Sequence, residues 1–302
     1  MYQELSRNWP DQYVPAGKMD YSKYKSSGRY YTGAERKKGI LIQGEPYIVK
    51  YAKNSPQGLT CSYLSEYIGS HLFRIAGIEA QETFLGKCDG LPVVVMKDFI
   101  GGDEIFVPFN DVGDSTLEQS RERYKYTYED IMLMLEENMK LTNVEETVRH
   151  FWDMYLIDAW IGNFDRHGSN WGFLKKDNRY RMAPVYDNGS SLFPRLNTDE
   201  KLSKIMESKE EMEKRVYQFP TSQILLKGQK SSYYELINSL HYKECNEALI
   251  RIKPRINMTN VEKMIDSINE ISKIRKRFYK EILLVRYQKM IENPFEKLTG
   301  DR

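Results

Sequence analysis

One polar stretch of the chain determines how its fold is interpreted: Gly162-Asn163-Phe164-Asp165-Arg166-His167-Gly168-Ser169-Asn170-Trp171. Apolar residues recur at helical spacing through 144–161, immediately before this stretch, and the runs 171–174 and 180–185 after it have the character of two strands joined by a turn. The polar stretch therefore connects a buried helix to a hairpin. Connections of this kind carry functional side chains more often than the elements that they join.

The spacing of two residues in this stretch indicates its chemistry. Asp165 is followed by four residues and then by Asn170, which is the arrangement in the catalytic loop of protein kinases. In that loop the carboxylate orients the attacking hydroxyl and accepts its proton, and the carboxamide oxygen binds Mg²⁺. Asp187 follows the hairpin, where a second carboxylate ligand is needed. Each residue alone is an ordinary turn former, but their ordered combination predicts a phosphoryl-transfer site.

The upstream part of the chain contains candidates for nucleotide binding. Lys50 lies near the end of an apolar strand, as the phosphate-binding lysine of kinases does. The periodicity of residues 62–76 predicts a helix, and Glu66 in that helix is suited to an ion pair with Lys50. The spacing leaves Glu35 and Glu79 open as alternative partners.

Two hairpin patterns enclose that helix. The first pairs 40–42 with 47–49 through a turn at Gly44-Glu45, and the second pairs 83–85 with 93–96 through a turn that holds Asp89-Gly90. We therefore expect a small sheet with one helix in this half of the chain.

These patterns predict an α+β, two-lobed, protein-kinase-like fold with a small β-rich N-lobe and a larger helical C-lobe. Residues 1–38 are expected to form an N-terminal arm and phosphate-loop region, 39–98 the N-lobe, and 99–302 the C-lobe with the catalytic and metal motifs. Lys97 and Phe99 stand where the lobes join, the place at which kinases bind adenine.

The C-terminal part is expected to be mostly helical. It ends in an amphipathic run from Val261 to Ile291, and Thr259 with Glu262 forms a capping box at its start. Residues 201–302 are also more basic than the first 200 residues. An excess of lysine and arginine of this kind is typical of the solvated faces of helices.

The composition excludes several other classes of protein. With 302 residues, 40% of them hydrophobic, and a net charge of +2, the chain can bury a large core and is not disordered. No apolar run reaches the roughly 20 residues of a membrane helix, and the first residues lack the apolar core of a signal peptide. Three scattered cysteines exclude a disulfide framework. We expect a cytoplasmic protein with reduced thiols.

A metal-dependent hydrolase is an alternative use of the same polar residues. In that interpretation the Asp-x-His triplet of Asp165 and His167 combines with His150 and Asp187. The chain has four histidines, and no two of them have the spacing of a paired metal ligand. The hydrolase is therefore the less favoured alternative, and it predicts activity without nucleotide.

The motifs resemble those of a known family. The runs 163–174 and 183–192, with Lys97-Asp98-Phe99, 151–154 and 251–256, are similar to the HipA-like serine/threonine kinases, and most similar to the short CtkA-type members of that family. The likeness spans about residues 40 to 290, and its two acidic motifs are specific. The resemblance implies a kinase that uses ATP and Mg²⁺, phosphorylates protein serine or threonine residues, and autophosphorylates.

The same resemblance assigns roles to individual residues. Asp165 is the implied catalytic base, and His167 occupies the motif's histidine and shapes the catalytic loop. Asn170 and Asp187 are the implied Mg²⁺ ligands, Lys50 binds phosphate, and Glu66 is the helix glutamate. Thr32, which abuts Gly33-Ala34 in a loop with few glycines, is the expected autophosphorylation site, with Ser26 and Ser27 as the other available hydroxyls.

Partners and location follow as expectations. Full-length HipA toxins have a domain ahead of the kinase, and only about forty residues precede the first hairpin here. An antitoxin partner is therefore an open question, direct nucleic-acid binding is not expected, and the protein is expected to be a monomer. It is expected in the cytoplasm, with export without a signal peptide left open. A small-molecule or lipid kinase, and a toxin-derived binding module that uses residues 273–277, are the remaining alternatives.

Overall fold

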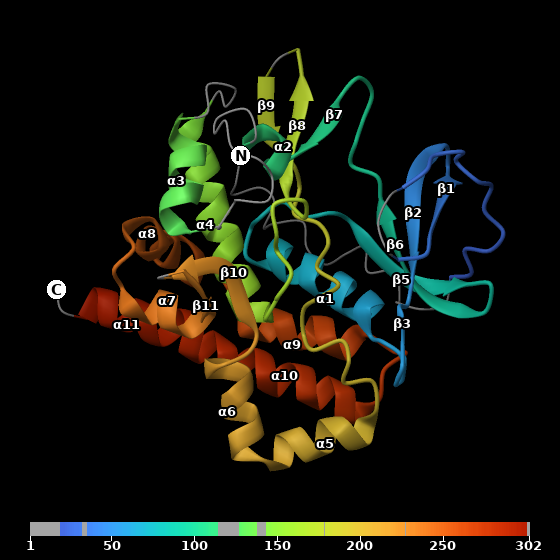
Figure 1. The fold of residues 1–302 in the computed structure, drawn as a ribbon. Coiled ribbons are helices and arrows are strands. Elements are labelled where there is room, and N and C mark those ends of the chain that lie inside the picture. Colours follow the sequence, from blue (N-terminus) through green and yellow to red (C-terminus); the bar gives the residue numbers. More distant parts are fainter. Residues whose placement is uncertain are drawn as a thin grey trace. The chain divides into compact units, whose positions relative to one another are not determined.

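The computed structural model describes residues 19–31, 35–113, 127–137, 143–177, 179–226 and 228–300. The chain forms two compact units, and each is assembled from segments that lie far apart in the sequence (Figure 1). Unit 1 contains the described residues up to Asp98 together with Asn188–Met212 and Arg255–Leu284. Unit 2 contains Phe99–Asp187, Glu213–Pro254 and the described residues from Val285 onward. The division into lobes at 39–98 and 99–302 stays a prediction.

Unit 1 is built on an antiparallel sheet with the strand order β1-β2-β6-β5. Its strands are the two predicted hairpins: β1 (Lys37–Ile42), β2 (Glu45–Tyr51), β5 (Thr83–Cys88) and β6 (Leu91–Lys97). The first turn is Gln43-Gly44, with φ values of 53° and 88°, so the turn predicted at Gly44-Glu45 is wrong by one residue. Two consecutive positive φ values are typical of a type I′ turn, whose twist matches that of the paired strands.

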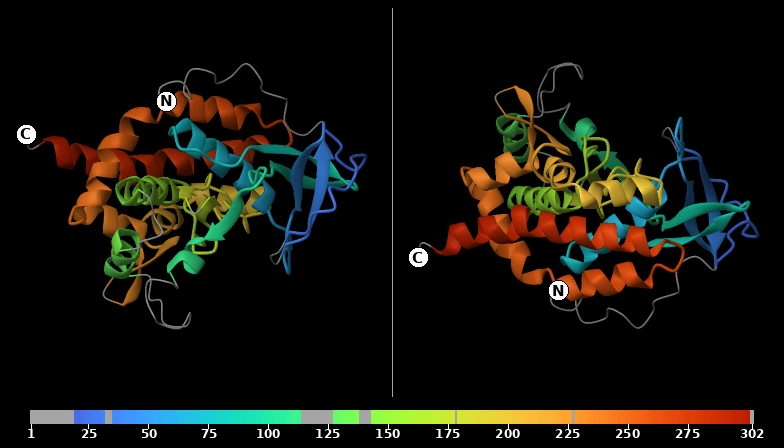
Figure 2. Two further views of the ribbon diagram at one scale, coloured as in Figure 1. Left: turned by 90° about the horizontal axis from the view of Figure 1, so that it is seen from above. Right: turned by 90° about the horizontal axis from the view of Figure 1, so that it is seen from below.

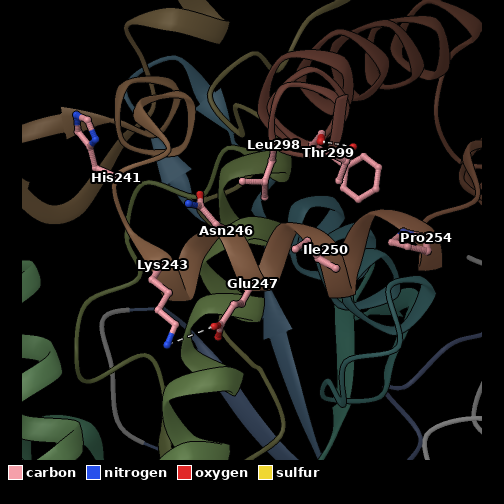
Figure 3. A pocket seen from close by; sticks show the side chains of 9 residues that line it. His241, Lys243, Asn246, Glu247, Ile250, Pro254, Leu298 and Thr299 are labelled. Atoms are coloured by element: carbon pink, nitrogen blue, oxygen red, sulfur yellow. Dashed lines mark hydrogen bonds and ion pairs between the residues drawn. The ribbon is translucent and has the colours of Figure 1, made fainter. Parts of the chain in front are cut away.

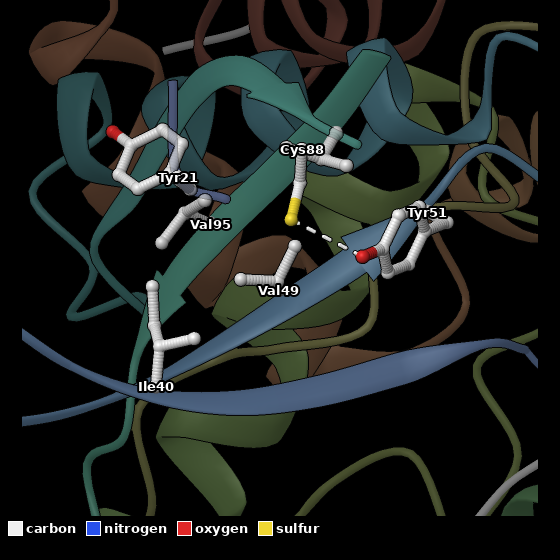
Figure 4. Packing of buried hydrophobic residues seen from close by; sticks show 7 residues of the cluster. Tyr21, Ile40, Val49, Tyr51, Cys88 and Val95 are labelled. Carbon is white, nitrogen blue, oxygen red and sulfur yellow. Dashed lines mark hydrogen bonds between the residues drawn. The ribbon is translucent and has the colours of Figure 1, made fainter. Parts of the chain in front are cut away.

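One face of this sheet carries a hydrophobic cluster (Figure 4). Val49 and Tyr51 of β2 point into the cluster, and the Tyr51 hydroxyl donates a hydrogen bond of 3.2 Å to the Sγ atom of Cys88. Because side chains alternate along a strand, Lys50 faces the opposite side of the sheet. Helix α1 (Ser62–Ile75) packs against β5 and β6 and supplies the partner of Lys50.

Helix α1 confirms the helix predicted at 62–76. Gly77 follows it with a φ of 74°, the left-handed conformation that commonly ends helices. Helix α9 (Met258–Ser267) packs beside α1, and Figure 2 shows the two together. Its N-cap is Asn257, whose side chain accepts the backbone N–H groups of Thr259 and Asn260.

The predicted C-terminal run is interrupted. The capping box of Thr259 and Glu262 is wrong, because Asn257 caps α9 two residues earlier. The chain then leaves the helix at the fully buried Ile268, which has extended backbone angles, and Ser272 begins a new helix by accepting the N–H of Arg275. The run is thereby divided into α9, α10 (Lys273–Tyr287) and a π-helical segment, η3 (Gln288–Glu292).

Unit 2 is organised around α4 (Val144–Ile161), which has the bounds predicted from its periodicity. Trp152 and Trp160 on this helix are fully buried. Helices α3 (Tyr128–Glu137) and α8 (Lys243–Ile252) pack against it.

A three-stranded antiparallel sheet, β7-β8-β9, completes the surroundings of α4. Strands β8 (Gly172–Lys176) and β9 (Arg179–Met182) confirm the third predicted hairpin. Strand β7 (Ile105–Pro108) was not predicted, because Ile105 is 63% exposed and this edge strand lacks a buried apolar run.

The remaining elements are short. The hairpin of β10 and β11, which interrupts the part expected to be helical, has mostly half-buried or exposed residues and hence a weak sequence pattern. These elements are β3 (Asn54–Ser55), β4 (Gly58–Leu59), α2 (Phe109–Gly113), α5 (Asp199–Glu207), α6 (Lys209–Tyr217), β10 (Thr221–Leu226), β11 (Gln229–Ser232), α7 (Tyr233–Ser239), η2 (Lys253–Arg255) and α11 (Asn293–Gly300).

Two further expectations concern the whole chain. The three cysteines are buried and carry free thiols, as predicted. In the described parts of the chain, no helix has both the length and the apolar character needed to cross a bilayer.

Candidate active site

The polar loop predicted to be catalytic begins where α4 ends. Gly162 has a φ of 67° and closes the helix in the left-handed conformation. Asn163 then turns back onto the helix, because its backbone N–H donates to the Asp158 carbonyl and its side-chain amide donates to the Asp158 carboxylate at 2.9 Å. The loop is therefore anchored to α4 at its first residue.

The loop holds Asp165 through its backbone and leaves the carboxylate accessible. The Asp165 N–H donates to the side chain of Asn163 at 3.1 Å, and the Asp165 carbonyl accepts from the side-chain amide of Asn170 at 2.7 Å. The side chain of Asp165 is 47% exposed. A carboxylate whose backbone is held by hydrogen bonds and whose oxygens are exposed to solvent can accept a proton from an incoming hydroxyl.

Arg166 links the loop to the segment that carries Asp187. Its Nε and Nη2 atoms donate to the Asp158 carboxylate at 2.8 and 3.0 Å. Its Nη1 atom donates to the Asn170 carbonyl at 2.8 Å and also to the Tyr186 carbonyl. One buried side chain thus positions both residues predicted to bind metal.

The charge of Arg166 is balanced inside the protein. Burial by itself lowers the pKa of this guanidinium, but the Asp158 carboxylate outweighs that effect and raises the pKa above its usual value. Asp158 is 1% exposed, so the two charges form a buried, bidentate pair. The sequence analysis assigned no role to Asp158, because its helical position looks like an ordinary buried one.

His167 contributes to the shape of the loop. Its Nδ1 atom accepts the backbone N–H of Ser169 at 3.2 Å, and its Nε2 atom lies 4.0 Å from an oxygen of Asp165. Both side chains are partly exposed. These contacts agree with the loop-shaping role expected for this histidine.

The donor set suits Mg²⁺. The side-chain nitrogen of Asn170 donates to the Asp165 carbonyl, so the amide oxygen is the atom suited to bind a metal, and Asp187 offers a carboxylate. Mg²⁺ prefers such hard oxygen ligands and is commonly completed by substrate phosphates and water. Among the described residues, no three His, Cys, Asp or Glu side chains cluster as a metal site.

The predicted ion pair of Lys50 and Glu66 is present in unit 1. Lys50 Nζ lies 3.0 Å from Glu66, which is fully buried, and its Oε1 atom accepts the backbone N–H of Asn188 at 2.7 Å. Glu35, one of the alternatives, also contacts Lys50, at 2.6 Å. Glu79 is exposed.

Gly189 completes this part of the site. A Cβ atom at this position would lie 3.2 Å from Glu66 Oε2 and 3.4 Å from Lys50 Nζ. The backbone that follows Asp187 therefore packs directly against the ion pair, and the absence of a side chain permits this approach.

The two residues predicted to bind adenine differ in their surroundings. The Lys97 backbone is already engaged, because its N–H donates to Glu82 and its carbonyl accepts from the Gln81 side chain. The Phe99 ring, in unit 2, packs 5.6 Å from the ring of Tyr186. The adenine-binding roles of Lys97 and Phe99 stay predictions.

The N-terminal arm contacts the end of β6. The side chains of Arg29 and Tyr31 both bond to the Asp98 carboxylate, at 2.6 and 2.8 Å. Thr32, the expected autophosphorylation site, lies outside the described residues.

Three side chains that the sequence analysis did not single out support the catalytic loop. Tyr233 donates its hydroxyl to the Asn163 carbonyl at 2.6 Å, and Gln223 donates its amide to the Phe164 carbonyl at 2.7 Å. The fully buried Arg286 donates to the carbonyl of Trp160 at 3.0 Å and to that of Ala159, at the end of α4. A charged residue on the apolar face of a predicted helix was the available signal for Arg286.

A cavity of about 440 Å³ lies elsewhere in unit 2, between α8 and α11 (Figure 3). None of the predicted site residues lines it, so the assignment of the site rests on the loop and not on this cavity. Its lining residues are His241, Lys243, Asn246, Glu247, Ile250, Pro254, Phe295, Leu298 and Thr299.

Known proteins are similar to this chain in sequence and in fold. The serine/threonine-protein kinase CtkA of Helicobacter pylori strain J99 is 32% identical over 262 residues, which covers 84% of this chain and 79% of CtkA. The crystal structure of the H. pylori proinflammatory kinase CtkA matches with a TM-score of 0.85 and 29% identity, covering 93% of this chain and 98% of that one. HipA in its complex with HipB and operator DNA, from Shewanella oneidensis MR-1, shares the fold at a TM-score of 0.56 and 14% identity, covering 98% and 73%.

The comparisons confirm the resemblance expected from the motifs and the two-lobed α+β fold class. Residues 30–273 match the family described as the HipA-like C-terminal domain. The chain belongs to the HipA-like C-terminal domain family.

Proposed function

We propose that this protein is a kinase that uses ATP and Mg²⁺ to phosphorylate serine or threonine residues of proteins. Its placement among the serine/threonine kinases follows from the identity to CtkA over most of both chains. The observation that carries the proposal for this site is the arrangement around Arg166, which ties the loop of Asp165 and Asn170 to the residue before Asp187.

Each site residue has a role in this reaction. The acceptor hydroxyl oxygen forms a bond to the γ-phosphorus, the bond from that phosphorus to the bridging oxygen breaks, and ADP leaves. Asp165 orients the hydroxyl and takes its proton. Asn170 and Asp187 would hold Mg²⁺, which would neutralise charge on the phosphates of ATP, and Lys50, oriented by Glu66, would bind phosphate oxygens.

The test is phosphoryl transfer by the purified chain. The protein is incubated with Mg-ATP and a cell extract, and phosphorylated peptides are identified by mass spectrometry. Asp165→Asn and Asp187→Asn are each expected to lower transfer at least a hundredfold while the protein stays folded. Asp177→Asn is the matched control, because Asp177 is an exposed acid on the hairpin between the two metal ligands. Near-normal transfer by either site variant contradicts the assignment.

The same experiment addresses autophosphorylation and the acceptor class. Phosphate on Thr32 is the expected modification of the protein itself, and its absence from residues 22–39 contradicts that proposal. Labelled phosphate on a lipid or small hydroxyl compound, with none on protein, indicates the small-molecule or lipid kinase instead.

The basic segment at 273–277 contains four cations, of which one is buried and one is paired with an acid. Arg275 is 6% exposed, Arg277 pairs with Glu281 at 2.6 Å, and Lys276 donates to the carbonyl of Asp266. DNA binding requires several lysines or arginines facing phosphates, so the burial of Arg275 and the pairing of Arg277 weigh against the toxin-derived binding module. An antitoxin partner remains a proposal that the HipA-like fold motivates.

A further inference from the structure

We infer that Glu35 occupies the phosphate-binding position on Lys50 when no nucleotide is bound, and that it competes with the phosphates of ATP. The inference rests on the proposed function, in which Lys50 binds those phosphates. It assigns Glu35 a role that determines nucleotide affinity, separate from the supporting role of Glu66.

The contact of Lys50 with Glu35 is shorter than its contact with Glu66. Lys50 Nζ lies 2.6 Å from a Glu35 oxygen and 3.0 Å from a Glu66 oxygen. The Lys50 side chain is 6% exposed, so both carboxylates approach a cation that has little contact with water. Two carboxylates on one ammonium leave a net negative charge at the place where a triphosphate must bind. A further anion is therefore repelled until one carboxylate leaves.

The two glutamates differ in how firmly they are held. Glu66 is fully buried within α1, and its second oxygen accepts the N–H of Asn188. The Glu35 side chain is 17% exposed and lies in the short segment before β1, outside any helix or strand. When phosphate approaches Lys50, Glu35 is consequently the carboxylate that can withdraw into water at the lower cost.

The contacts of Arg36, the next residue in the chain, hold Glu35 close to Lys50. The Arg36 carbonyl accepts the N–H of Tyr51 at 3.1 Å, and the Arg36 guanidinium lies 4.0 Å from the centre of the Tyr51 ring. Since Tyr51 follows Lys50 on β2, these contacts hold Glu35 beside the lysine. The contact of Glu35 with Lys50 is therefore fixed by the backbone pairing at the edge of the sheet.

The test compares the affinity of Mg-ATP and of adenosine for wild type, Glu35→Gln and Glu79→Gln by calorimetry. Glu79→Gln is the matched control, because it removes the same charge from the same unit at an exposed position. Glu35→Gln is expected to tighten ATP binding about tenfold, or about 1.4 kcal/mol. Adenosine, which has no phosphate, is expected to bind both variants as it binds wild type.

Other results overturn the inference. Unchanged ATP affinity in Glu35→Gln shows that the carboxylate does not compete, and weaker ATP binding shows that it helps to orient Lys50. An equal change in adenosine affinity indicates a general effect on the fold. Lys50→Met separates the two proposals: if wild type binds ATP and Lys50→Met does not, the phosphate-binding role of Lys50 in the proposed function stands whatever Glu35→Gln does. If wild type binds no ATP, both proposals fail.

Discussion

Replacing Asp158 with asparagine tests the central role of the buried pair with Arg166. The carboxylate accepts two guanidinium hydrogen bonds and one from the Asn163 amide, and it is 1% exposed. Removing one partner of a buried pair costs about 3–5 kcal/mol, because the other charge stays behind. An asparagine oxygen can keep one of these bonds, so we expect the lower figure, about 3 kcal/mol.

This decrease in the free energy of unfolding can be measured by thermal or urea denaturation. At roughly 2–4 °C for each kcal/mol, Asp158→Asn is expected to lower the Tm by about 6–12 °C. The double variant Asp158→Leu with Arg166→Met removes both charges and is expected to recover most of the Tm, since apolar residues often replace such pairs without loss. It is not expected to recover phosphoryl transfer, because the Asn170 and Tyr186 carbonyls lose their shared donor.

Two results refute this reasoning. If Asp158→Asn melts within about 2 °C of wild type, the pair does not carry the free energy assigned to it. If the double variant transfers phosphate at the wild-type rate, Arg166 does not position the metal ligands. Activity is measured well below the Tm of each variant, so that unfolding does not contribute.

The remaining predictions concern the glycine beside Lys50, the second metal ligand and pH. Gly189→Ala is expected to weaken ATP binding severalfold through its 3.2 Å contact with Glu66, whereas Gly101→Ala, which has open space around it, serves as the control; equal affinities contradict the packing argument. Asn170→Ala is expected to raise the Mg²⁺ concentration needed for half-maximal transfer, measured by titration, and an unchanged requirement removes Asn170 from the metal site. Burial lowers the pKa of His71 to about 4, so below pH 6.5 the unfolded chain binds a proton that the folded chain does not. The stability advantage of wild type over His71→Gln in urea should therefore shrink by about 2 kcal/mol between pH 7.5 and pH 5, and a constant difference contradicts it.

Sequence patterns predicted the elements whose burial is strongly periodic. Helix α4 was predicted residue for residue because an amphipathic stripe and a terminal glycine mark it clearly. The edge strand β7 was missed because pairing with β8, and not an apolar pattern, makes it a strand. The capping box failed because the helix begins before Thr259: the Asn257 side chain accepts the backbone N–H groups of Thr259 and Asn260, so Thr259 lies inside the first turn of α9.

The candidate site was predictable in its local parts only. The spacing of Asp165 and Asn170 is a motif within one loop. The pairing of Lys50 with Glu66 joins a strand to the next helix along the chain, so it too is local in sequence. The contact of Asn188 with Glu66 joins residues 122 positions apart, and no spacing rule foresees it. The spacing left Glu35 and Glu79 open as alternatives to Glu66, and it did not foresee that Glu35 and Glu66 contact Lys50 together.

The position of Arg286 in the chain has a consequence for when the enzyme can become active. Its guanidinium bonds to the carbonyl of Trp160, which is synthesised 126 residues earlier. During translation the end of α4 therefore lacks this partner until another 126 residues have been added to the chain. The contact between Arg286 and Trp160 also forms late in folding, because the two residues are far apart in the sequence. Ribosome-bound chains that end before residue 286 are thus expected to be inactive, so activity is expected in a cell only after Arg286 has been synthesised and has left the ribosome.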